Sequence, residues 1–131
     1  MIGLDTNVIV RYIMQDDARQ SRLASTLIEE LTADDPGFVP LVAVIELVWV
    51  LSSSFELARA QIISALEILL QIREIQIERA EVVWRALRMY QGSSADFADC
   101  MVERSAAAAG CLRTMTFDRS AAKHCSMTLI Q

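Results

Sequence analysis

Short apolar runs alternate with longer amphipathic segments along the whole chain. The short runs are brief and either apolar or alternating, which is typical of strands. The longer segments repeat apolar residues every three or four positions, which is typical of helices that pack by one face. The predicted strands are residues 2–4, 38–39, 75–77, 112–117 and 127–130, and the predicted helices are residues 8–13, 17–31, 40–52, 57–72, 79–90, 96–109 and a short one from Asp118. This alternation predicts an α/β domain whose mainly parallel sheet is covered by helices on both faces.

Several residues mark the ends of these elements. Pro36 and Gly37 break the second helix, and Pro40 suits the first turn of the third, where its missing N–H is not needed. Gly110 follows the sixth helix, at the place of a C-cap glycine. The packed face of the second helix is expected to carry Leu23, Leu27, Ile28 and Leu31.

Composition narrows the class of protein. A chain of 131 residues that is 53% hydrophobic fits one folded domain, residues 1–131. Its longest apolar stretch, residues 40–50, is too short to span a bilayer and carries Glu46 in its middle. No secretory signal peptide, with a basic segment followed by an apolar one, is visible, and the three cysteines are scattered. We therefore expect a cytoplasmic protein with reduced thiols. A zinc site is not expected from these cysteines and a single histidine.

The net charge of -5 is unusual for a protein that binds nucleic acid. If about five carboxylates gather in one pocket and bind metal ions, however, the remaining surface is close to neutral. The basic residues are almost all arginines, whose guanidinium groups bind phosphate well. Arg11, Arg19 and Arg22 are therefore candidate phosphate contacts, with solvated helix faces as the alternative.

Two aspartates follow predicted strands. Asp5 comes directly after residues 2–4, and Asp118 comes directly after residues 112–117. In an open parallel α/β sheet, ligands bind at the carboxyl ends of the strands, so both carboxylates are predicted to reach this edge. Taken singly, each aspartate is also well placed as a helix N-cap, which is the commoner role.

Three further acids lie on predicted helices. Asp96 and Asp99 are three residues apart and share a helix face, although Asp96 is equally well interpreted as an N-cap. Glu103 follows one turn later and is expected to be solvated or paired with an arginine, the adjacent Arg104 not facing it. Glu46 lies among valines and leucines, where an ionised carboxylate is costly unless it is paired or binds a metal. Glu46 is therefore the acid that most favours a metal site.

The absence of histidine or cysteine partners decides the kind of metal. Carboxylates alone suit hard cations such as Mg²⁺ or Mn²⁺. Two such ions about 4 Å apart activate a water and stabilise the leaving oxygen in phosphodiester cleavage. The acids therefore predict a metal-dependent centre that cleaves phosphodiesters.

Four short segments carry these acids in a distinctive order. They are Ile2-Gly-Leu-Asp-Thr-Asn-Val-Ile-Val, Ile45-Glu-Leu, Ala95-Asp-Phe-Ala-Asp-Cys and Thr116-Phe-Asp-Arg. Together they resemble the PIN domain over essentially the whole chain, and within that superfamily the VapC-type toxins of bacterial toxin–antitoxin pairs. The resemblance implies a PIN-like three-layer α/β/α fold with a central, mainly parallel sheet.

The resemblance also implies roles for particular residues. The acids that match the family's catalytic and metal-binding positions are Asp5, Glu46, Asp99 and Asp118, with Asp96 as an additional metal ligand and Asn7 and Thr116 as polar residues that orient the carboxylates. One or two Mg²⁺ or Mn²⁺ ions are the implied cofactors. The implied substrate is RNA, cut by a metal-bound water to leave a 3′-hydroxyl and a 5′-phosphate. A small antitoxin that enters the acidic cleft and a second copy of the chain are the implied partners.

Other functions fit the sequence less well. A phosphatase of the haloacid dehalogenase kind needs an aspartate two residues after the first, and position 7 is Asn. A response-regulator receiver domain needs a paired acid before Asp5, and none is present. A catalytically silent PIN-fold interaction module is the remaining alternative, but such proteins usually lack one or more of the acids. The sequence therefore favours a metal-dependent ribonuclease.

Overall fold

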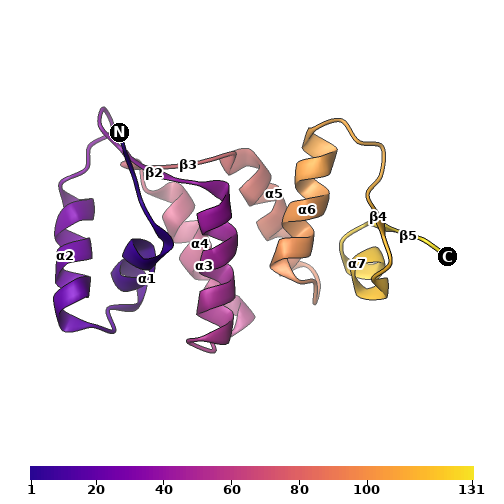
Figure 1. Ribbon diagram of the computed structural model, residues 1–131, viewed down its shortest axis with the longest axis horizontal. Coiled ribbons are helices and arrows are strands. Elements are labelled where there is room, and N and C mark those ends of the chain that lie inside the picture. Colours follow the sequence, from indigo (N-terminus) through magenta and orange to yellow (C-terminus); the bar gives the residue numbers. More distant parts are fainter. The chain divides into compact units, whose positions relative to one another are not determined.

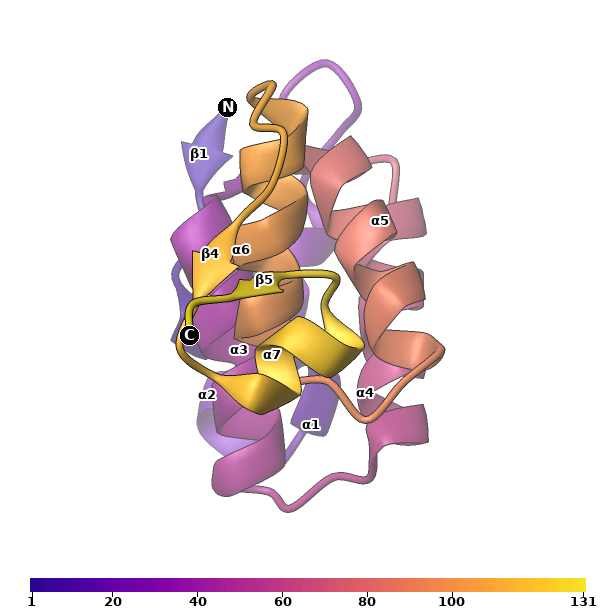
Figure 2. The same cartoon turned by 90° about the vertical axis from the view of Figure 1, so that its right-hand side faces the viewer.

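The computed structural model describes all residues from Met1 to Gln131. The chain forms two compact units, Met1–Glu78 and Arg79–Gln131, and each is described by itself. The chain contains seven helices and five short strands, most of which are labelled in Figure 1, and Figure 2 labels β1. All strand pairs are parallel in both units, which confirms the predicted α/β class with parallel strands.

Three strands form the sheet of the first unit, in the order β1-β2-β3. They are β1 (Ile2–Gly3), β2 (Gly37–Val39) and β3 (Ile75–Ile77). At the start of β2, a Cβ on Gly37 would lie 2.7 Å from Cδ1 of Leu4 and 2.9 Å from Cδ1 of Leu31. A larger residue at position 37 would therefore force these two leucine side chains to shift.

Helices make the two crossovers that parallel strands require. They are α1 (Thr6–Met14) and α2 (Ala18–Glu29) between β1 and β2, and α3 (Leu41–Ser53) and α4 (Arg59–Gln71) between β2 and β3. Helix α1 packs against α2 and α3, and α3 packs against α4. The fully buried side chains of this unit include Ile9, Val44, Leu47, Leu51 and Leu66. The core of the first unit thus lies where these helices meet.

The packed face of α2 differs from the prediction. Ser21, Ala24 and Ile28 are buried, whereas Leu23 is 56% exposed. Small side chains on the buried face allow α2 to approach its neighbour closely, and Leu23 and Leu27 instead line a pocket. The prediction that Leu23 is packed was wrong because it was based on the positions of large apolar residues, whereas the buried face of α2 also includes the small residues Ser21 and Ala24.

The second unit contains two longer helices and a small parallel strand pair. Its elements are α5 (Ala80–Gln91), α6 (Phe97–Ala108), β4 (Met115–Thr116), α7 (Arg119–His124) and β5 (Thr128–Leu129). Helices α5 and α6 pack together, and the rings of Tyr90 and Phe97 meet edge to face with their centroids 5.6 Å apart. Helix α7 lies beside the β4–β5 pair (Figure 2).

The fourth strand is shorter than residues 112–117. Only Met115 and Thr116 pair with β5, and Leu112 is fully exposed. The backbone oxygen of Thr114 still accepts a hydrogen bond from the N–H of Thr128 at 2.8 Å, but residues 112 and 113 have no partner in β5, and a strand needs such a partner. The closing strand is likewise limited to Thr128 and Leu129.

No helix in either unit has the length and apolar character needed to cross a bilayer.

Candidate active site

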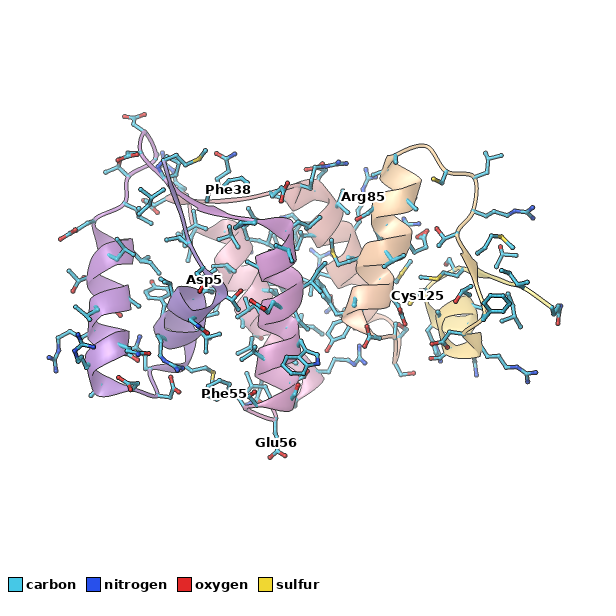
Figure 3. All side chains as sticks on the ribbon, viewed as in Figure 1. Asp5, Phe38, Phe55, Glu56, Arg85 and Cys125 are labelled. Atoms are coloured by element: carbon cyan, nitrogen blue, oxygen red, sulfur yellow. The ribbon has the colours of Figure 1, made fainter.

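Asp5 and Glu46 line the same pocket in the first unit. Asp5 follows β1 at the start of α1 (Figure 3), and Glu46 lies in the second turn of α3. The pocket has a volume of about 380 Å³. Its lining residues are Gly3, Leu4, Asp5, Thr6, Pro40, Val42, Ala43 and Glu46. The structure therefore brings together the strand-end aspartate and the α3 glutamate that the sequence singled out.

The side chain of Asp5 is not used to cap a helix. Asp5 occupies the N-cap position of α1 with extended backbone angles (φ −76°, ψ 156°), but its carboxylate makes no cap hydrogen bond. The side chain is also exposed. The capping role that was the commoner expectation for Asp5 is therefore wrong, and both carboxylate oxygens are open to a ligand.

Glu46 is exposed, contrary to the burial expected from its apolar neighbours. Helix α3 buries Val44, Leu47 and Leu51, whereas Val42 is 73% exposed and shares the side of the helix that carries Glu46. Because this helix is apolar nearly all round, its sequence does not reveal which face is buried. The cost of burying a charge therefore no longer supports a metal site at Glu46.

A direct contact with Thr6 links Glu46 to the pocket instead. The Thr6 hydroxyl donates a hydrogen bond to Oε1 of Glu46 across the pocket. Thr6 is only 3% exposed, so its side chain is held by packing and can hold the carboxylate in turn. Thr6 was not among the site residues predicted from the sequence, although its place directly after Asp5 was a usable signal.

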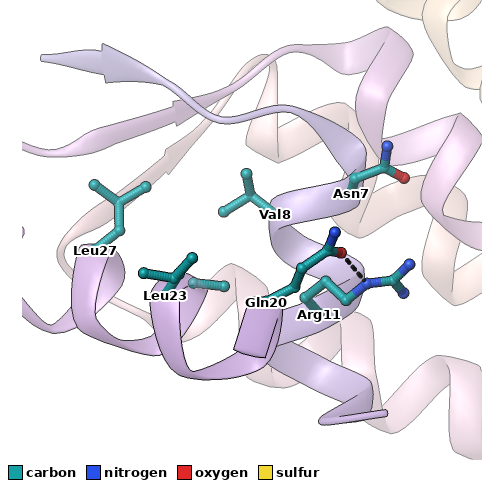
Figure 4. Close-up of a pocket in the computed structure, with 7 residues that line it drawn as sticks. Asn7, Val8, Arg11, Gln20, Leu23 and Leu27 are labelled. Carbon is teal, nitrogen blue, oxygen red and sulfur yellow. Dashed lines mark hydrogen bonds between the residues drawn. The ribbon is translucent and has the colours of Figure 1, made fainter. Parts of the chain in front are cut away.

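Asn7 lies in a different pocket. It lines a hollow of about 340 Å³ between α1 and α2, together with Arg11, Gln20 and apolar side chains of α2 (Figure 4). In that pocket Nε of Arg11 donates to Oε1 of Gln20 at 2.8 Å, and Arg11 also pairs with Asp16. Thr6, rather than Asn7, is thus the polar residue that contacts a candidate metal-binding acid of this unit, Glu46.

Asp96 and Asp118 cap helices in the second unit. Oδ1 of Asp96 accepts a hydrogen bond from the backbone N–H of Asp99 at 3.2 Å. Oδ1 of Asp118 accepts two, from Ser120 at 2.8 Å and Ala121 at 3.2 Å. Each cap uses a single carboxylate oxygen, which leaves Oδ2 open to another ligand. Capping and metal binding are therefore compatible at both residues.

Thr116 fixes the chain that leads to Asp118. Its hydroxyl oxygen accepts a hydrogen bond from the backbone N–H of Asp118 at 3.0 Å. This contact closes the turn between β4 and α7 at the residue that carries the Asp118 carboxylate. Thr116 therefore acts on the backbone of an acid, whereas Thr6 acts directly on a carboxylate.

Asp99 is electrostatically linked to both capping aspartates. Burial raises the pKa of the Asp99 carboxyl above its ordinary value, and repulsion from Asp96 and Asp118 raises it further. The three acids of the second unit therefore lie near enough to repel one another. A cation placed among them would relieve this repulsion.

Glu103 does not belong with these acids. It is 6% exposed, and Nη2 of Arg104 donates to its Oε2 at 2.8 Å while Nε of Arg104 donates to Oε1. The expectation that Arg104 does not face Glu103 is wrong, because the long arginine side chain folds back onto its neighbour. Glu103 is a charge neutralised by Arg104.

The donor set fits a hard divalent cation. In neither unit do three acidic, histidine or cysteine side chains converge tightly enough to enclose a metal ion. Mg²⁺ does not need such a cage, because it commonly keeps several waters and binds through one or two carboxylates. Asp5 with Glu46 offers one such pair, and Asp99 with Asp96 and Asp118 offers a second group. All of these donors are oxygens, as Mg²⁺ and Mn²⁺ prefer.

The fold and these side chains define an α/β protein that carries carboxylates just after the ends of its parallel strands. The chain belongs to the PIN-domain family, whose model matches residues 2–125. This match confirms the PIN-like three-layer α/β/α class, and PIN domains are generally nucleases. A search among proteins of curated function finds no match to the chain.

Proposed function

We propose that this protein is a Mg²⁺- or Mn²⁺-dependent endoribonuclease. The observation that carries the proposal is the pocket shared by Asp5 and Glu46. Asp5 makes no helix cap, so capping does not explain its carboxylate, and the Thr6 hydroxyl orients Glu46 in the same pocket. Membership of a family of nucleases supplies the reaction class.

We assign metal binding to both groups of acids. Asp5 and Glu46 form the group of the first unit, and Asp96, Asp99 and Asp118 form that of the second. Their joint action in catalysis is inferred from the resemblance to PIN domains, in which the matching acids work together. A metal held by these acids would supply Lewis acidity, which would lower the pKa of an attacking water and stabilise the charge on the leaving oxygen.

The protein's own contribution is orientation and charge. Thr6 holds the Glu46 carboxylate in one direction, and Thr116 fixes the backbone of Asp118. The pKa of Asp99 is raised mainly by burial and further by repulsion from Asp96 and Asp118, and a cation would offset that repulsion.

RNA cleavage by purified protein tests the proposal. A labelled single-stranded RNA of mixed sequence is incubated with Mg²⁺, with Mn²⁺ or with EDTA, and the products are separated on a denaturing gel. We expect cleavage with either metal, none with EDTA, and none with Asp5→Asn purified in the same way. Asp34→Asn is the matched control, because Asp34 is an exposed loop acid outside both groups. Cleavage that persists in Asp5→Asn or in EDTA would contradict the proposal.

We further propose that the nuclease is the toxin of a VapBC-type pair, acting in the cytoplasm as a homodimer and inhibited by a small antitoxin. The resemblance of the four acid-bearing segments to VapC-type toxins supports this role. Induced expression in a bacterial host is expected to arrest growth, and co-expression of the neighbouring reading frame to restore it. Arrest that persists with Asp5→Asn, or no arrest at all, would leave a PIN-domain nuclease without a toxin role. Size-exclusion chromatography with light scattering tests the dimer.

A further inference from the structure

Two buried thiols face each other in the second unit. Sγ of Cys100 and Sγ of Cys125 are 3.9 Å apart, and both side chains are fully buried. Cys100 lies in the first turns of α6, and Cys125 is the C-cap residue of α7 (Figure 3). The two sulfurs are therefore in van der Waals contact but belong to different elements, and their residues are 25 positions apart in the sequence.

We propose that Cys100 and Cys125 form a reversible disulfide when the protein meets a low-molecular-weight disulfide oxidant. A disulfide requires a sulfur–sulfur distance of about 2.05 Å, so the two atoms must approach by roughly 2 Å. Rotation of two side chains and a small shift of α7 can provide this approach, because α7 has only six residues. An ordinary buried cysteine, by contrast, packs against carbon and has no second sulfur to attack.

The reaction balances with glutathione disulfide as the oxidant. Because both thiols are buried, a local opening of the short helix α7 must first expose one of them. Its thiolate then attacks a sulfur of glutathione disulfide, which forms a mixed disulfide and releases one glutathione thiol. The second cysteine then displaces the remaining glutathione and closes the Cys100–Cys125 bond. The two cysteines together lose two electrons and two protons, and one oxidant disulfide is reduced to two thiols.

The bond would fasten α7 to α6 at a point close to the acids. Cys100 is adjacent to Asp99, and α7 begins directly after Asp118. Because the cross-link restricts the unfolded chain between residues 100 and 125, the thermal unfolding midpoint is expected to rise by roughly 5–10 °C. This outcome concerns the fold of the second unit and does not depend on nuclease activity.

The third cysteine provides the control. Cys111 is exposed, so it is the thiol that reacts first with any oxidant and that joins two molecules together. The experiment therefore uses the Cys111→Ser variant as the parent protein. Cys111→Ser/Cys125→Ala, which retains only Cys100, is the matched variant that lacks the pair.

The test is peptide mapping under non-reducing conditions after the folded parent is incubated with glutathione disulfide. Burial raises the pKa of the Cys125 thiol and slows its reaction, so incubation is run for hours at mildly alkaline pH. We expect a Cys100–Cys125 cross-linked peptide, an intact mass lower by two hydrogens, and a raised unfolding midpoint that dithiothreitol reverses. The matched variant should show none of these changes.

Two results would overturn the proposal. The first is a folded parent that stays fully reduced while Cys111 of the unsubstituted protein becomes modified in the same incubation. The second is a cross-link that forms only when denaturant is added, since the folded contact would then be irrelevant. Either result would leave Cys100 and Cys125 as ordinary packing residues.

Discussion

The contact between Thr6 and Glu46 makes the sharpest prediction about the site. Thr6→Val keeps the branched shape of the side chain, so no cavity opens, but it removes the hydroxyl that donates to Oε1 of Glu46. A hydrogen bond to a charged group is worth about 1.5–3 kcal/mol, and the value falls toward about 1 kcal/mol here because water can replace the donor at an exposed carboxylate. The unfolding midpoint is therefore expected to fall by roughly 3–5 °C.

The expected effect on activity is larger than the effect on stability. Residues that orient metal-binding carboxylates commonly change metal affinity or activity by about 10–100-fold when they are replaced. We expect a loss in this range for RNA cleavage by Thr6→Val at a fixed Mg²⁺ concentration, at a temperature where the variant stays folded. Thr6→Ser retains a hydroxyl and should keep most of the activity. Cleavage by Thr6→Val at the original rate and with the original Mg²⁺ dependence would refute the idea that Thr6 orients Glu46.

Three further predictions concern substitutions elsewhere in the protein, at Asp118, Asp99 and Gly37. Asp118→Asn keeps a side-chain oxygen that can cap α7, so the thermal unfolding midpoint should be almost unchanged while RNA cleavage is lost. Asp118→Ala also removes the cap, which should lower the free energy of unfolding by about 1 kcal/mol. Asp99→Asn should stabilise the metal-free protein at pH 7, because a carboxyl whose folded pKa is raised carries an unfavourable charge above that pKa. The gain should vanish in unfolding scans at pH values below the ordinary pKa of aspartate, and a destabilised Asp99→Asn at pH 7 would contradict the electrostatic account. Gly37→Ala should cost about 1–3 kcal/mol in urea unfolding, since its Cβ would collide with Leu4 and Leu31, and an unchanged midpoint would show that both leucines can move aside.

Much of the fold was predictable because it is encoded locally. The apolar and alternating pattern predicted all seven helices, and residues 75–77 were predicted with the observed bounds of β3. Pro40 precedes α3 as expected for a residue that suits the start of a helix. Strand lengths were less predictable, because a strand ends where its partner ends. Leu112 shows this, since it is apolar and yet fully exposed outside β4.

The candidate site was predictable in its residue types but not in its contacts. The position of Asp5 after a strand is visible in the sequence, yet only the structure shows that its carboxylate leaves α1 uncapped. The apolar neighbours of Glu46 suggested burial, which was wrong because helix orientation depends on what packs against α3. Helix capping was a possible role for all three aspartates, and the structure shows it for Asp96 and Asp118 but not for Asp5.

The sequence by itself determined the elements, the family and the set of acids, because helix periodicity and short segments around the aspartates are properties of neighbouring residues. The tertiary structure alone decided which hydroxyl meets which carboxylate and which thiols touch. Thr6 and Glu46 are 40 positions apart in the sequence, and Cys100 and Cys125 are 25 apart. Contacts over such separations depend on how whole helices pack, and no local pattern specifies them.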